Sequence, residues 1–223
     1  MTLQILPDLE QGSPEWHAVR RGIVTASVVG KLLTPTLKVA DNDYSRGLTV
    51  ALAAERITGW TEDTPMTSDM WRGVESEPYA RDIYSGHFAE VTEVGFMLWE
   101  SPDWRLGYSP DGLVGDDGLI EIKAPRAKTH LRTILADEVP AHYMPQLQAG
   151  LLVSGRDWID FVSYVGGMPL YVKRVEPDPR WVLAIVAACK TFEANAAQIV
   201  ADYEQRVADM PQTERIDFEI KVA

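Results

Sequence analysis

The sequence of 223 residues contains one cysteine, Cys189, and four scattered histidines. A single cysteine excludes a disulfide within the chain and any site that needs four cysteines, such as many zinc and iron–sulfur sites. The histidines show no H-E-x-x-H spacing, which argues against a zinc hydrolase of that type. The sequence also lacks a G-x-x-x-x-G-K-[ST] phosphate-binding loop, so we expect no ATP hydrolysis.

Long apolar runs are missing as well. No stretch of about 18 apolar residues occurs, so we expect no membrane span. The N-terminus has no basic start followed by an apolar run, which argues against secretion and for a cytoplasmic protein. Because 46% of the residues are hydrophobic, the chain can bury one sizeable core, and we expect a single domain over residues 1–223.

Basic residues are fewer than acidic ones, 21 against 33, and the net charge is −12. Nucleic-acid-binding proteins usually carry a basic surface, so this total is unusual for one. The charges are unevenly distributed, however: residues 61–103 are strongly acidic, whereas residues 121–135 are rich in lysine and arginine. An acidic surface with a basic groove suits an enzyme that holds DNA at one place. It suits equally an acidic enzyme that has no nucleic-acid substrate.

The hydrophobic pattern predicts an α/β fold, with a central mixed sheet flanked by helices. Helices are expected over residues 14–20, from Thr25 or Ser27 to Leu33, and over 44–59, 68–85, 141–153 and 179–207. Strands are expected over 88–99, 105–114, 118–124, 157–165 and 168–175. The last residues, 208–223, are interpreted as a C-terminal tail.

Charged residues interrupt the apolar strands in SPDGLVGDDGLIEIK, residues 109–123. Glu121 and Lys123 share one face of the predicted strand, because side chains alternate along a strand. Asp111 joins them only if the hairpin pairs one residue away from the simplest register, or if the chain bends at Gly112. We predict the shifted pairing or this bend. Two carboxylates would then meet beside a lysine.

Such a group has a recognisable chemistry. Mg²⁺ prefers oxygen ligands, which Asp111, Glu121 and the main-chain carbonyl of Ile122 would supply. A metal ion held there would polarise a phosphoryl oxygen and lower the pKa of a bound water. Lys123 would orient that water or stabilise negative charge on the phosphate. The plain alternative is a solvated Glu–Lys pair on a surface hairpin, which is what an E-x-K triplet usually is.

Four segments together resemble a known enzyme family. Pro110-Asp111, followed ten residues later by Glu121-Ile122-Lys123, is similar to the PD-(D/E)xK nuclease signature. WHAVRRGIVTAS (16–27), WRGVESEPYAR (71–81) and HYMPQLQAGLLVSG (142–155) resemble three further motifs of one branch of these nucleases. As a set, in this order and over about residues 12–165, they resemble the phage lambda exonuclease family, also called the YqaJ-type viral recombinases.

The resemblance implies a PD-(D/E)xK, restriction-endonuclease-like core and a metal-dependent deoxyribonuclease. Such an enzyme degrades the 5′ strand of linear double-stranded DNA from an end and leaves a 3′ overhang for recombination by strand annealing. The resemblance also implies Mg²⁺ as cofactor, with two ions per active site and Mn²⁺ as a substitute. Its implied partners are double-stranded DNA ends, a single-strand annealing protein and further copies of the chain in a ring-shaped homotrimer, inside a phage-infected or prophage-carrying bacterial cell.

Roles for individual residues follow from the resemblance. The implied catalytic residues are Asp111, Glu121, Lys123, Glu77 and Gln146, and the implied metal ligands are Asp111, Glu121 and Ile122. Arg20, Ser27 and Ser109 match residues that hold the terminal 5′-phosphate, and a guanidinium does bind phosphate oxygens in a fork. Glu77, Arg20 and Ser27 also have a structural interpretation. Glu77 would then be a solvated helix residue, Arg20 would form a surface ion pair and leave its role to Arg21, and Ser27 would be a helix cap.

Three other functions stay open from the sequence. The chain could be a sequence-specific endonuclease on the same core, a non-catalytic DNA-end binder that recruits an annealing protein, or an acidic metal-binding protein unrelated to DNA. The segment from Arg20 to Ser27 suits a terminal phosphate and so favours an exonuclease over an endonuclease. Together, Asp111, Glu121 and Lys123 favour a catalyst over a binder.

Overall fold

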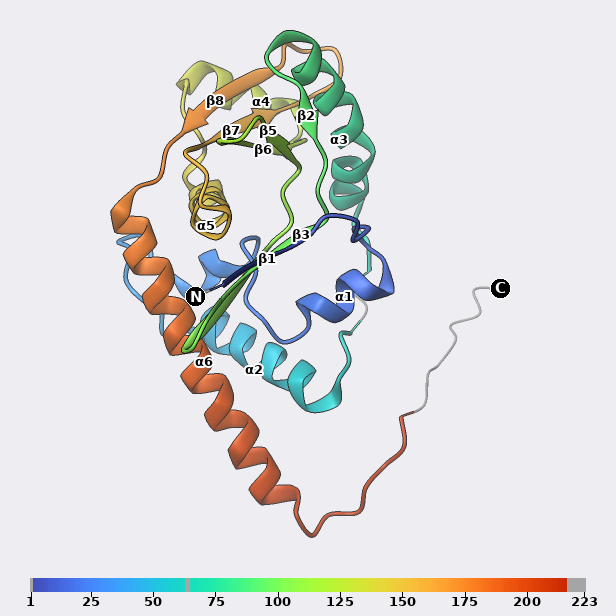
Figure 1. Cartoon of the computed structure of the whole chain (residues 1–223), viewed down its shortest axis with the longest axis vertical. Helices are drawn as coiled ribbons and strands as arrows, with labels where there is room; N and C mark the ends of the chain where they lie inside the picture. Colours follow the sequence, from blue (N-terminus) through green and yellow to red (C-terminus); the bar gives the residue numbers. More distant parts are fainter. Residues whose placement is uncertain (1, 63–64, 216–223) are drawn as a thin grey trace.

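The structure is a computed structural model that describes residues 2–62 and 65–215. Its strands and helices follow one another from Thr2 to Val207 (Figure 1). The strands are β1 Thr2–Leu6, β2 Val91–Thr92, β3 Phe96–Ser101, β4 Trp104–Tyr108, β5 Gly112–Val114, β6 Gly118–Lys123, β7 Trp158–Ser163 and β8 Tyr171–Val175. The α-helices are α1 Pro14–Arg20, α2 Asp43–Thr58, α3 Ser68–His87, α4 Ala127–Ala136, α5 Met144–Ser154 and α6 Pro179–Val207. Two 3-10 turns are η1 Val29–Leu32 and η2 Ala141–Tyr143.

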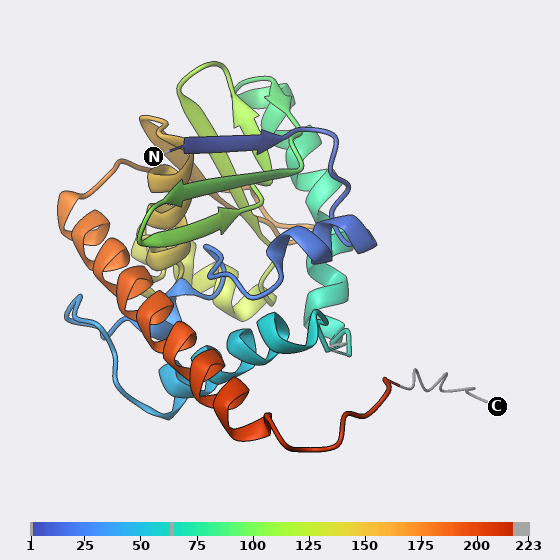
Figure 2. The same cartoon turned by 60° about the horizontal axis from the view of Figure 1, so that its bottom comes forward.

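The described strands form two sheets. One is antiparallel and has the order β1–β3–β4, and Figure 2 shows its three strands side by side. The other has the order β2–β5–β6–β7–β8 and is mixed, because β6 and β7 run parallel. The chain passes from the first sheet to the second between β4 and β5, at residues 109–111. Pro110 lies at this junction and has no N–H to continue a ladder of hydrogen bonds.

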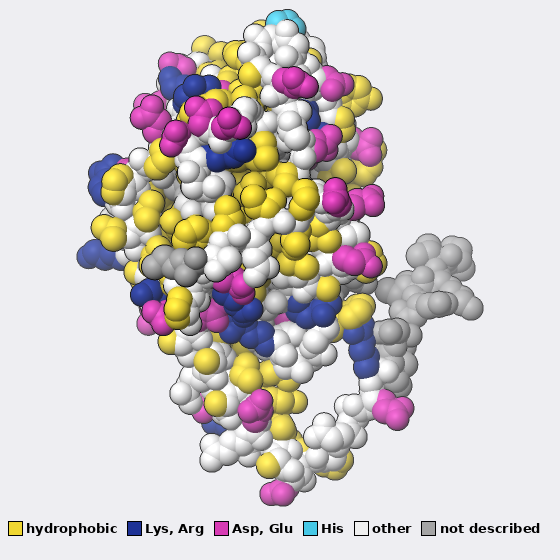
Figure 3. Space-filling view, viewed as in Figure 1, with side chains coloured by type: hydrophobic (Ala, Val, Ile, Leu, Met, Phe, Trp, Pro, Cys, Tyr) yellow, Lys and Arg dark blue, Asp and Glu magenta, His cyan; other side chains and the backbone are white. Residues whose placement is uncertain are grey.

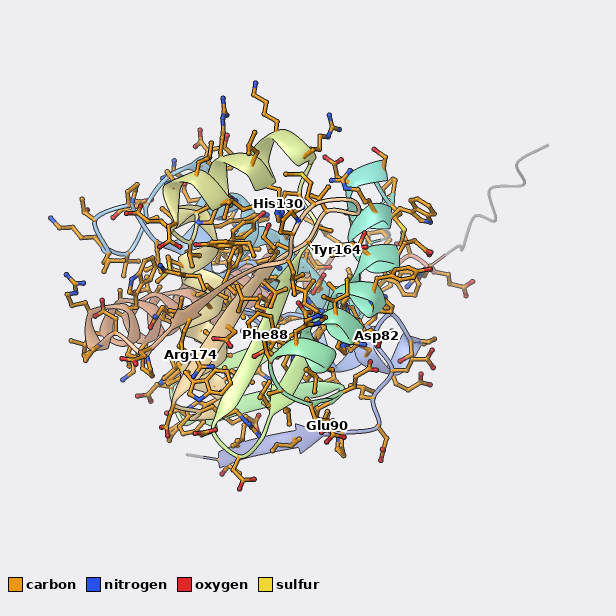
Figure 4. All side chains as sticks on the ribbon, turned by 90° about the horizontal axis from the view of Figure 1, so that it is seen from above. Asp82, Phe88, Glu90, His130, Tyr164 and Arg174 are labelled. Carbon is orange, nitrogen blue, oxygen red and sulfur yellow. The ribbon has the colours of Figure 1, made fainter. Side chains whose placement is uncertain are left out.

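Helices cover both faces of the five-stranded sheet. On one face, Tyr84 of α3 packs with Ile120 and Ile122 of β6, and Tyr164 joins this cluster beside α3 (Figure 4). On the other face, α5 and α6 pack against a core that includes Leu119. Since side chains alternate along a strand, Glu121 lies on the same face as Leu119. The acidic face of β6 is therefore turned toward α5.

Several predicted elements are confirmed. The mixed sheet flanked by helices is present, and α1, α2, α3 and α6 lie within two residues of their predicted bounds. The C-terminal part of the predicted helix 141–153 is α5, whereas its first turn is the 3-10 turn η2. The strands expected over 118–124, 157–165 and 168–175 are β6, β7 and β8.

Other predicted elements were wrong in extent. The strand expected over 88–99 is divided into β2 and β3, which belong to different sheets. At Gly95, before β3, a Cβ atom would lie 2.2 Å from the Leu9 carbonyl oxygen, so the chain passes too close to its neighbour for another residue. The strand expected over 105–114 is divided into β4 and β5 by the junction at Pro110. The hydrophobic pattern did not reveal these breaks, because apolar residues occur on both sides of each of them.

The helix expected from Thr25 or Ser27 to Leu33 is also wrong. Only η1 forms there, and Thr25 instead makes an isolated parallel bridge to Gly107 of β4. The main-chain N–H of Ala26 donates to the Gly107 carbonyl at 2.8 Å. This segment therefore extends the edge of the three-stranded sheet. Strand β1 and helix α4 were not predicted.

Helix α6 closes the fold. Its buried side chains lie on one side of the helix and belong to the main core: Ala184, Ile185, Ala188, Cys189, Phe192 and Ala196. Within the described part of the chain, α6 alone is long and apolar enough to cross a membrane by length and composition, and 33% of its most apolar window is buried in the protein. Core helices of soluble proteins pass the same test, so this similarity is weak support for a membrane span.

The predicted C-terminal tail begins directly after α6. Residues 208–215 form neither helix nor strand. The Arg215 guanidinium carbon lies 3.1 Å from the ring centroid of Trp60, which brings this part of the tail back to the end of α2. The remainder of the predicted tail, 216–223, lies outside the described residues.

Candidate active site

The β5–β6 hairpin brings Asp111 to Glu121. It pairs Gly112 with Ile120, which is the shifted register that the sequence predicts, so this prediction is confirmed. Continued by one residue, the register places Asp111 opposite Glu121. Asp111 Oδ2 accepts a hydrogen bond from the main-chain N–H of Ile122 at 2.6 Å. The carboxylate of the junction is thereby attached to the neighbouring strand.

Both carboxylate oxygens of Glu121 have partners, and the residue is only 1% exposed. Its Oε1 accepts from Lys123 Nζ at 2.6 Å and from the side-chain amide of Gln146. Its Oε2 accepts from the Tyr108 hydroxyl at 3.1 Å. Gly150, in the same helix as Gln146, makes room for this tyrosine, because a Cβ atom there would lie 2.7 Å from Tyr108 Cζ. Strands β4 and β6 and helix α5 together hold one buried carboxylate.

The acidic side chains repel one another. Burial raises the pKa of the Asp111 carboxyl well above its usual range, and the charge of Glu121 raises it further against the opposing effect of Lys123. Burial also raises the pKa of Glu77, where Arg81 opposes and Glu121 adds to the rise. A cation placed among these groups would relieve the repulsion. The site therefore has the electrostatic character of a cation-binding site.

The available oxygen atoms fit Mg²⁺. Asp111 Oδ1 makes no hydrogen bond within residues 2–62 and 65–215, and carboxylate oxygens have lone pairs beyond those that Glu121 already uses. Mg²⁺ commonly takes one or two carboxylates and keeps several waters. Among the described residues, no three His, Cys, Asp or Glu side chains form a group suited to a metal. The further ligands would therefore be the Ile122 carbonyl and water.

Arg81 ties helix α3 to the turn that carries Asp111. Its guanidinium donates to Glu77 Oε1, and its Nε donates to the Asp111 carbonyl oxygen at 3.0 Å. A third contact joins Arg81 to Glu93 at 2.9 Å. Arg81 was not among the residues that the sequence singled out. Its spacing of four residues from Glu77 on a predicted helix was the available signal.

One cavity of about 810 Å³ unites the predicted site. It is lined by all the residues that the sequence singled out: Arg20, Ser27, Glu77, Ser109, Asp111, Glu121, Ile122, Lys123 and Gln146. Arg21, the alternative to Arg20, does not line it. Gln148 does not line it either; its side chain binds the Glu176 carbonyl and the Asp178 N–H, both at 2.8 Å, and so supports the start of α6. The elements thus bring together residues more than 120 positions apart in the sequence.

Trp16 organises the basic side of the cavity. The Arg20 guanidinium carbon lies 3.6 Å from the centroid of the Trp16 ring. The indole N–H of Trp16 donates to Ser109 Oγ at 3.0 Å. Ser27 Oγ lies 3.1 Å from Thr25 Oγ1. One aromatic side chain therefore contacts two residues that come from α1 and from the junction after β4.

Arg20 is a partly buried cation that forms no salt bridge with any described residue. Burial lowers the pKa of Arg20 to about 10, while the charge of Glu55 raises it, so the side chain is still protonated at neutral pH. In the part of the chain that the structure describes, no carboxylate lies within salt-bridge distance of it. Its N–H groups are therefore available to an anion that enters the cavity.

Comparisons with known proteins give a consistent result. The sequence matches the YqaJ-like viral recombinase domain over residues 15–157. The structure is similar to the crystal structure of an alkaline exonuclease, LHK-Exo, from Laribacter hongkongensis, with a TM-score of 0.79 and 35% sequence identity over 89% of this chain and 100% of that chain. The crystal structure of LHK-Exo in complex with dAMP matches with the same values. A phage-related exonuclease from Haemophilus somnus 129PT shares the fold, with a TM-score of 0.60 and 13% identity over 81% of this chain and 96% of that chain. No curated protein matches the sequence.

The regions matched in these comparisons include the residues of the candidate active site. The recombinase domain covers more than half of the chain, and every residue singled out by the sequence lies within it. The similarity to LHK-Exo extends over the whole of that exonuclease. The family resemblance and the enzyme class predicted from the sequence are both confirmed. This chain belongs to the YqaJ-like viral recombinase domain family and is a nuclease.

Proposed function

We propose that this protein is a Mg²⁺-dependent exonuclease that degrades the 5′ strand of linear double-stranded DNA and leaves a 3′ overhang. One observation carries the proposal. A single cavity contains both the carboxylate–lysine group and Arg20 with its two serines, and Arg20 forms no salt bridge within residues 2–62 and 65–215. An exonuclease needs a hydrolytic centre and, beside it, a group that recognises an end. The similarity to an alkaline exonuclease, and to its complex with dAMP, supports DNA as the substrate class.

The hydrolytic centre follows from the positions of the acidic groups. Asp111, Glu121 and the Ile122 carbonyl would hold Mg²⁺, which supplies positive charge to the scissile phosphate and lowers the pKa of a bound water. Lys123 Nζ lies beside Glu121 and can donate to a water or a phosphate oxygen in the cavity. Gln146 holds the Glu121 carboxylate in place by a hydrogen bond. The family resemblance adds a second ion per site, for which Glu77 would complete the acidic group, and Mn²⁺ as a substitute.

The recognition of an end follows from the basic side of the cavity. Because the Trp16 ring covers one face of the Arg20 guanidinium, the N–H groups at its edge are presented to a ligand. Ser109 Oγ accepts the indole N–H, which leaves its own hydroxyl proton to donate to a phosphate oxygen. Ser27 adds a second hydroxyl in the same cavity. Arg20, Ser27 and Ser109 would thus bind the 5′-phosphate of the strand that is degraded.

One assay tests the proposal. A linear duplex is labelled at either end, carries a 5′-phosphate or a 5′-hydroxyl, and is incubated with and without Mg²⁺. The expected result is release of mononucleotides from the phosphorylated 5′ end in the presence of Mg²⁺ only. Internal cuts in closed circular DNA would show an endonuclease instead. Binding of ends without release of nucleotides would show a non-catalytic end binder.

Replacement of Arg20 by alanine should remove the preference for phosphorylated ends. The loss of a charge-assisted hydrogen bond is expected to lower kcat/KM on 5′-phosphorylated duplex by about 10- to 100-fold, and to change the value on 5′-hydroxyl duplex much less. The steady-state kinetics of both substrates give the comparison. Arg21→Ala is the matched control, because Arg21 does not line the cavity. An equal loss on both substrates would refute the assigned role of Arg20.

A milder change tests Trp16. Trp16→Phe keeps an aromatic ring beside Arg20 but removes the N–H that binds Ser109. The loss of one neutral hydrogen bond is expected to raise KM for phosphorylated duplex by about fivefold. Ser109→Ala removes the other partner, and the double variant should be less impaired than the product of the two single effects. Independent effects in this double-mutant cycle would show that Trp16 does not act through Ser109.

Three parts of the proposal rest on the family resemblance alone. The protein would assemble as a ring-shaped homotrimer, it would deliver its 3′ overhang to a single-strand annealing protein, and it would act in the cytoplasm of a phage-infected or prophage-carrying bacterium. Light scattering coupled to size exclusion measures the mass of the assembly in solution. A mass of one chain at working concentration would contradict the ring.

A further inference from the structure

Gly22 is held at both of its main-chain polar groups by side chains of α2. Its N–H donates to Glu55 Oε2 at 2.7 Å, and its carbonyl accepts from Arg56 Nε at 2.6 Å. Its φ angle is +67°, and a Cβ atom there would lie 2.5 Å from Arg56 Cγ, so glycine alone fits this position without strain. Two neighbouring side chains of one helix therefore set both the position and the orientation of this peptide.

The two side chains that hold Gly22, Glu55 and Arg56, are called the clamp, and α6 anchors it through Arg56. Arg56 makes a two-pronged ion pair with Glu193, in which its terminal nitrogens lie 3.0 and 2.8 Å from the two carboxylate oxygens. The Arg56 and Glu193 side chains are 20% and 18% exposed, so solvent screens this pair only partly. Helices α2 and α6 lie side by side in two views (Figures 1 and 2). Basic side chains gather over this region of the molecule (Figure 3). Glu193 lies outside the matched recombinase domain, which ends at residue 157.

Gly22 lies inside the segment that carries the proposed ligands of the 5′-phosphate. Arg20 precedes it by two residues, and Ser27 follows it by five. The segment after Gly22 is attached to β4, because Gly107 donates to the Val24 carbonyl at 2.9 Å. A displacement of the Gly22 peptide would therefore move Arg20 relative to Ser27. In this class of site a misplacement of about 1 Å is enough to reduce function strongly.

We propose that Glu55, Arg56 and Glu193 are positioning residues that set how strongly the enzyme prefers a 5′-phosphorylated end. None of the three lines the cavity, so none acts on the substrate itself. All three act through Gly22, and Glu55 also acts through the effect of its charge on Arg20. The inference rests on the proposed function, in which Arg20 binds the terminal phosphate. A plain structural role, in which the ion pair only joins α2 to α6, predicts a loss of stability with no effect on phosphate preference.

The main test is Glu193→Gln, which removes one charge and keeps the size of the side chain. The expected result is a KM for 5′-phosphorylated duplex raised about tenfold, with kcat and the KM for 5′-hydroxyl duplex each within about twofold of the wild type. Lys190→Gln is the matched control, since Lys190 lies one turn earlier on α6 and pairs with the exposed Asp103 at 3.3 Å. This control should keep the wild-type preference.

Two further comparisons separate positioning from stability. Arg56→Lys keeps the positive charge, but an ammonium group lacks the planar fork that binds Gly22 and Glu193 together, so phosphate preference should fall about as far as in Glu193→Gln. Glu55→Gln keeps an oxygen that can accept from the Gly22 N–H, whereas Glu55→Ala does not. The glutamine variant should therefore retain more of the preference than the alanine variant. Circular dichroism and thermal unfolding establish that each variant is folded.

The outcomes are distinct. Folded variants that keep the wild-type preference would overturn the inference, and so would an equal fall of kcat on both substrates. If Glu193→Gln does not fold, Arg56→Lys and the two Glu55 variants decide the question in the same way. A wild-type enzyme that shows no preference for phosphorylated ends would overturn the role of Arg20 itself, and the inference with it. If the wild type prefers phosphorylated ends and all clamp variants keep that preference, the inference is overturned while the role of Arg20 stands.

Discussion

Asp111→Asn should abolish cleavage and at the same time make the metal-free protein more stable. Replacement of residues that merely support metal ligands commonly lowers metal affinity or activity by about 10- to 100-fold, so loss of a proposed direct ligand should cost more than about 100-fold in cleavage. The asparagine side chain still offers an oxygen to the Ile122 N–H, so the local fold should persist. Nucleotide release with Mg²⁺ is measured on freshly purified protein, because an asparagine before Gly112 can deamidate back to aspartate.

The gain in stability follows from the raised pKa of Asp111, which is caused first by burial and then by Glu121. When the pKa of a carboxyl is higher in the folded than in the unfolded state, ionisation favours unfolding. The metal-free wild type should therefore lose stability as pH rises from the usual aspartate pKa through the higher pKa of the folded state. The variant lacks this loss, so without metal its melting temperature should be higher at neutral pH, by about 2–4 °C for each kcal/mol.

The measurement is thermal unfolding with a chelator between about pH 5 and pH 8, and the difference between the two proteins should shrink toward acid. Asp116→Asn is the matched control, because Asp116 is exposed on the turn of the same hairpin and does not line the cavity. It should change neither activity nor the pH dependence. A less stable Asp111→Asn protein, or one that cleaves normally, would contradict the proposed cation site.

Lys123→Ala should also stop cleavage, but with the opposite effect on stability. Loss of a positive group that stabilises charge on the scissile phosphate is expected to lower kcat by on the order of 10²–10³-fold. Lys123 is one of several basic groups in the cavity, together with Arg20, Arg72 and Arg126, so the Kd for duplex DNA should change little. Single-turnover cleavage gives the first quantity, and fluorescence anisotropy without cleavage gives the second.

The stability change follows from the contact with Glu121. Lys123 Nζ lies 2.6 Å from Glu121 Oε1, and its removal leaves a buried carboxylate with one donor fewer. This should destabilise the metal-free protein by about 1–3 kcal/mol, and Mg²⁺ should restore part of the loss because it supplies positive charge at the same place. Lys128→Ala removes an equal charge from the exposed side of α4 and serves as the control. Unchanged kcat in Lys123→Ala would refute the catalytic role of this lysine.

The sequence was informative wherever a local pattern had one structural solution. Alternation along β6 placed Glu121 and Lys123 on one face, and of the two predicted ways to bring Asp111 to them, a shifted pairing or a bend at Gly112, the structure contains the shifted pairing. Arg20 was distinguished from Arg21 by the family motif, and the structure agrees that only Arg20 lines the cavity. These predictions depended on neighbours in the chain or on a motif with defined order.

The partners of these residues were not predictable in the same way. Tyr108 binds the Glu121 carboxylate, Arg81 binds the turn at Asp111, and Trp16 joins Arg20 to a serine 93 residues away. Tyrosine, arginine and tryptophan are common residues in cores and on helices, and apart from the four-residue spacing of Arg81 from Glu77 nothing in their spacing marks them. Which of them reaches a buried acid depends on how α1, α3 and β4 pack against the hairpin.

The breaks in the predicted strands have a similar origin. Hydrophobic residues recur on both sides of each break, so the hydrophobic pattern predicts one strand over 88–99 and one over 105–114. Both breaks occur where the chain changes sheet, from the five-stranded to the three-stranded sheet at Gly95 and back again at Pro110. A change of sheet alters the hydrogen-bond partners of a strand, which the hydrophobic pattern does not record.

The sequence by itself determined the class of fold, the family and nine residues that line the cavity, and it limited the hairpin that carries the acids to a shifted register or a bend at Gly112. These properties follow from periodicity, from turn residues and from the order of motifs along the chain, all of which can be seen without knowledge of packing. Only the tertiary structure decided which side chains hold Glu121, how Trp16 places Arg20, and that α6 reaches Gly22 through Arg56. Contacts of this kind join residues far apart in the chain, and they form only where packed elements meet at hydrogen-bonding distance.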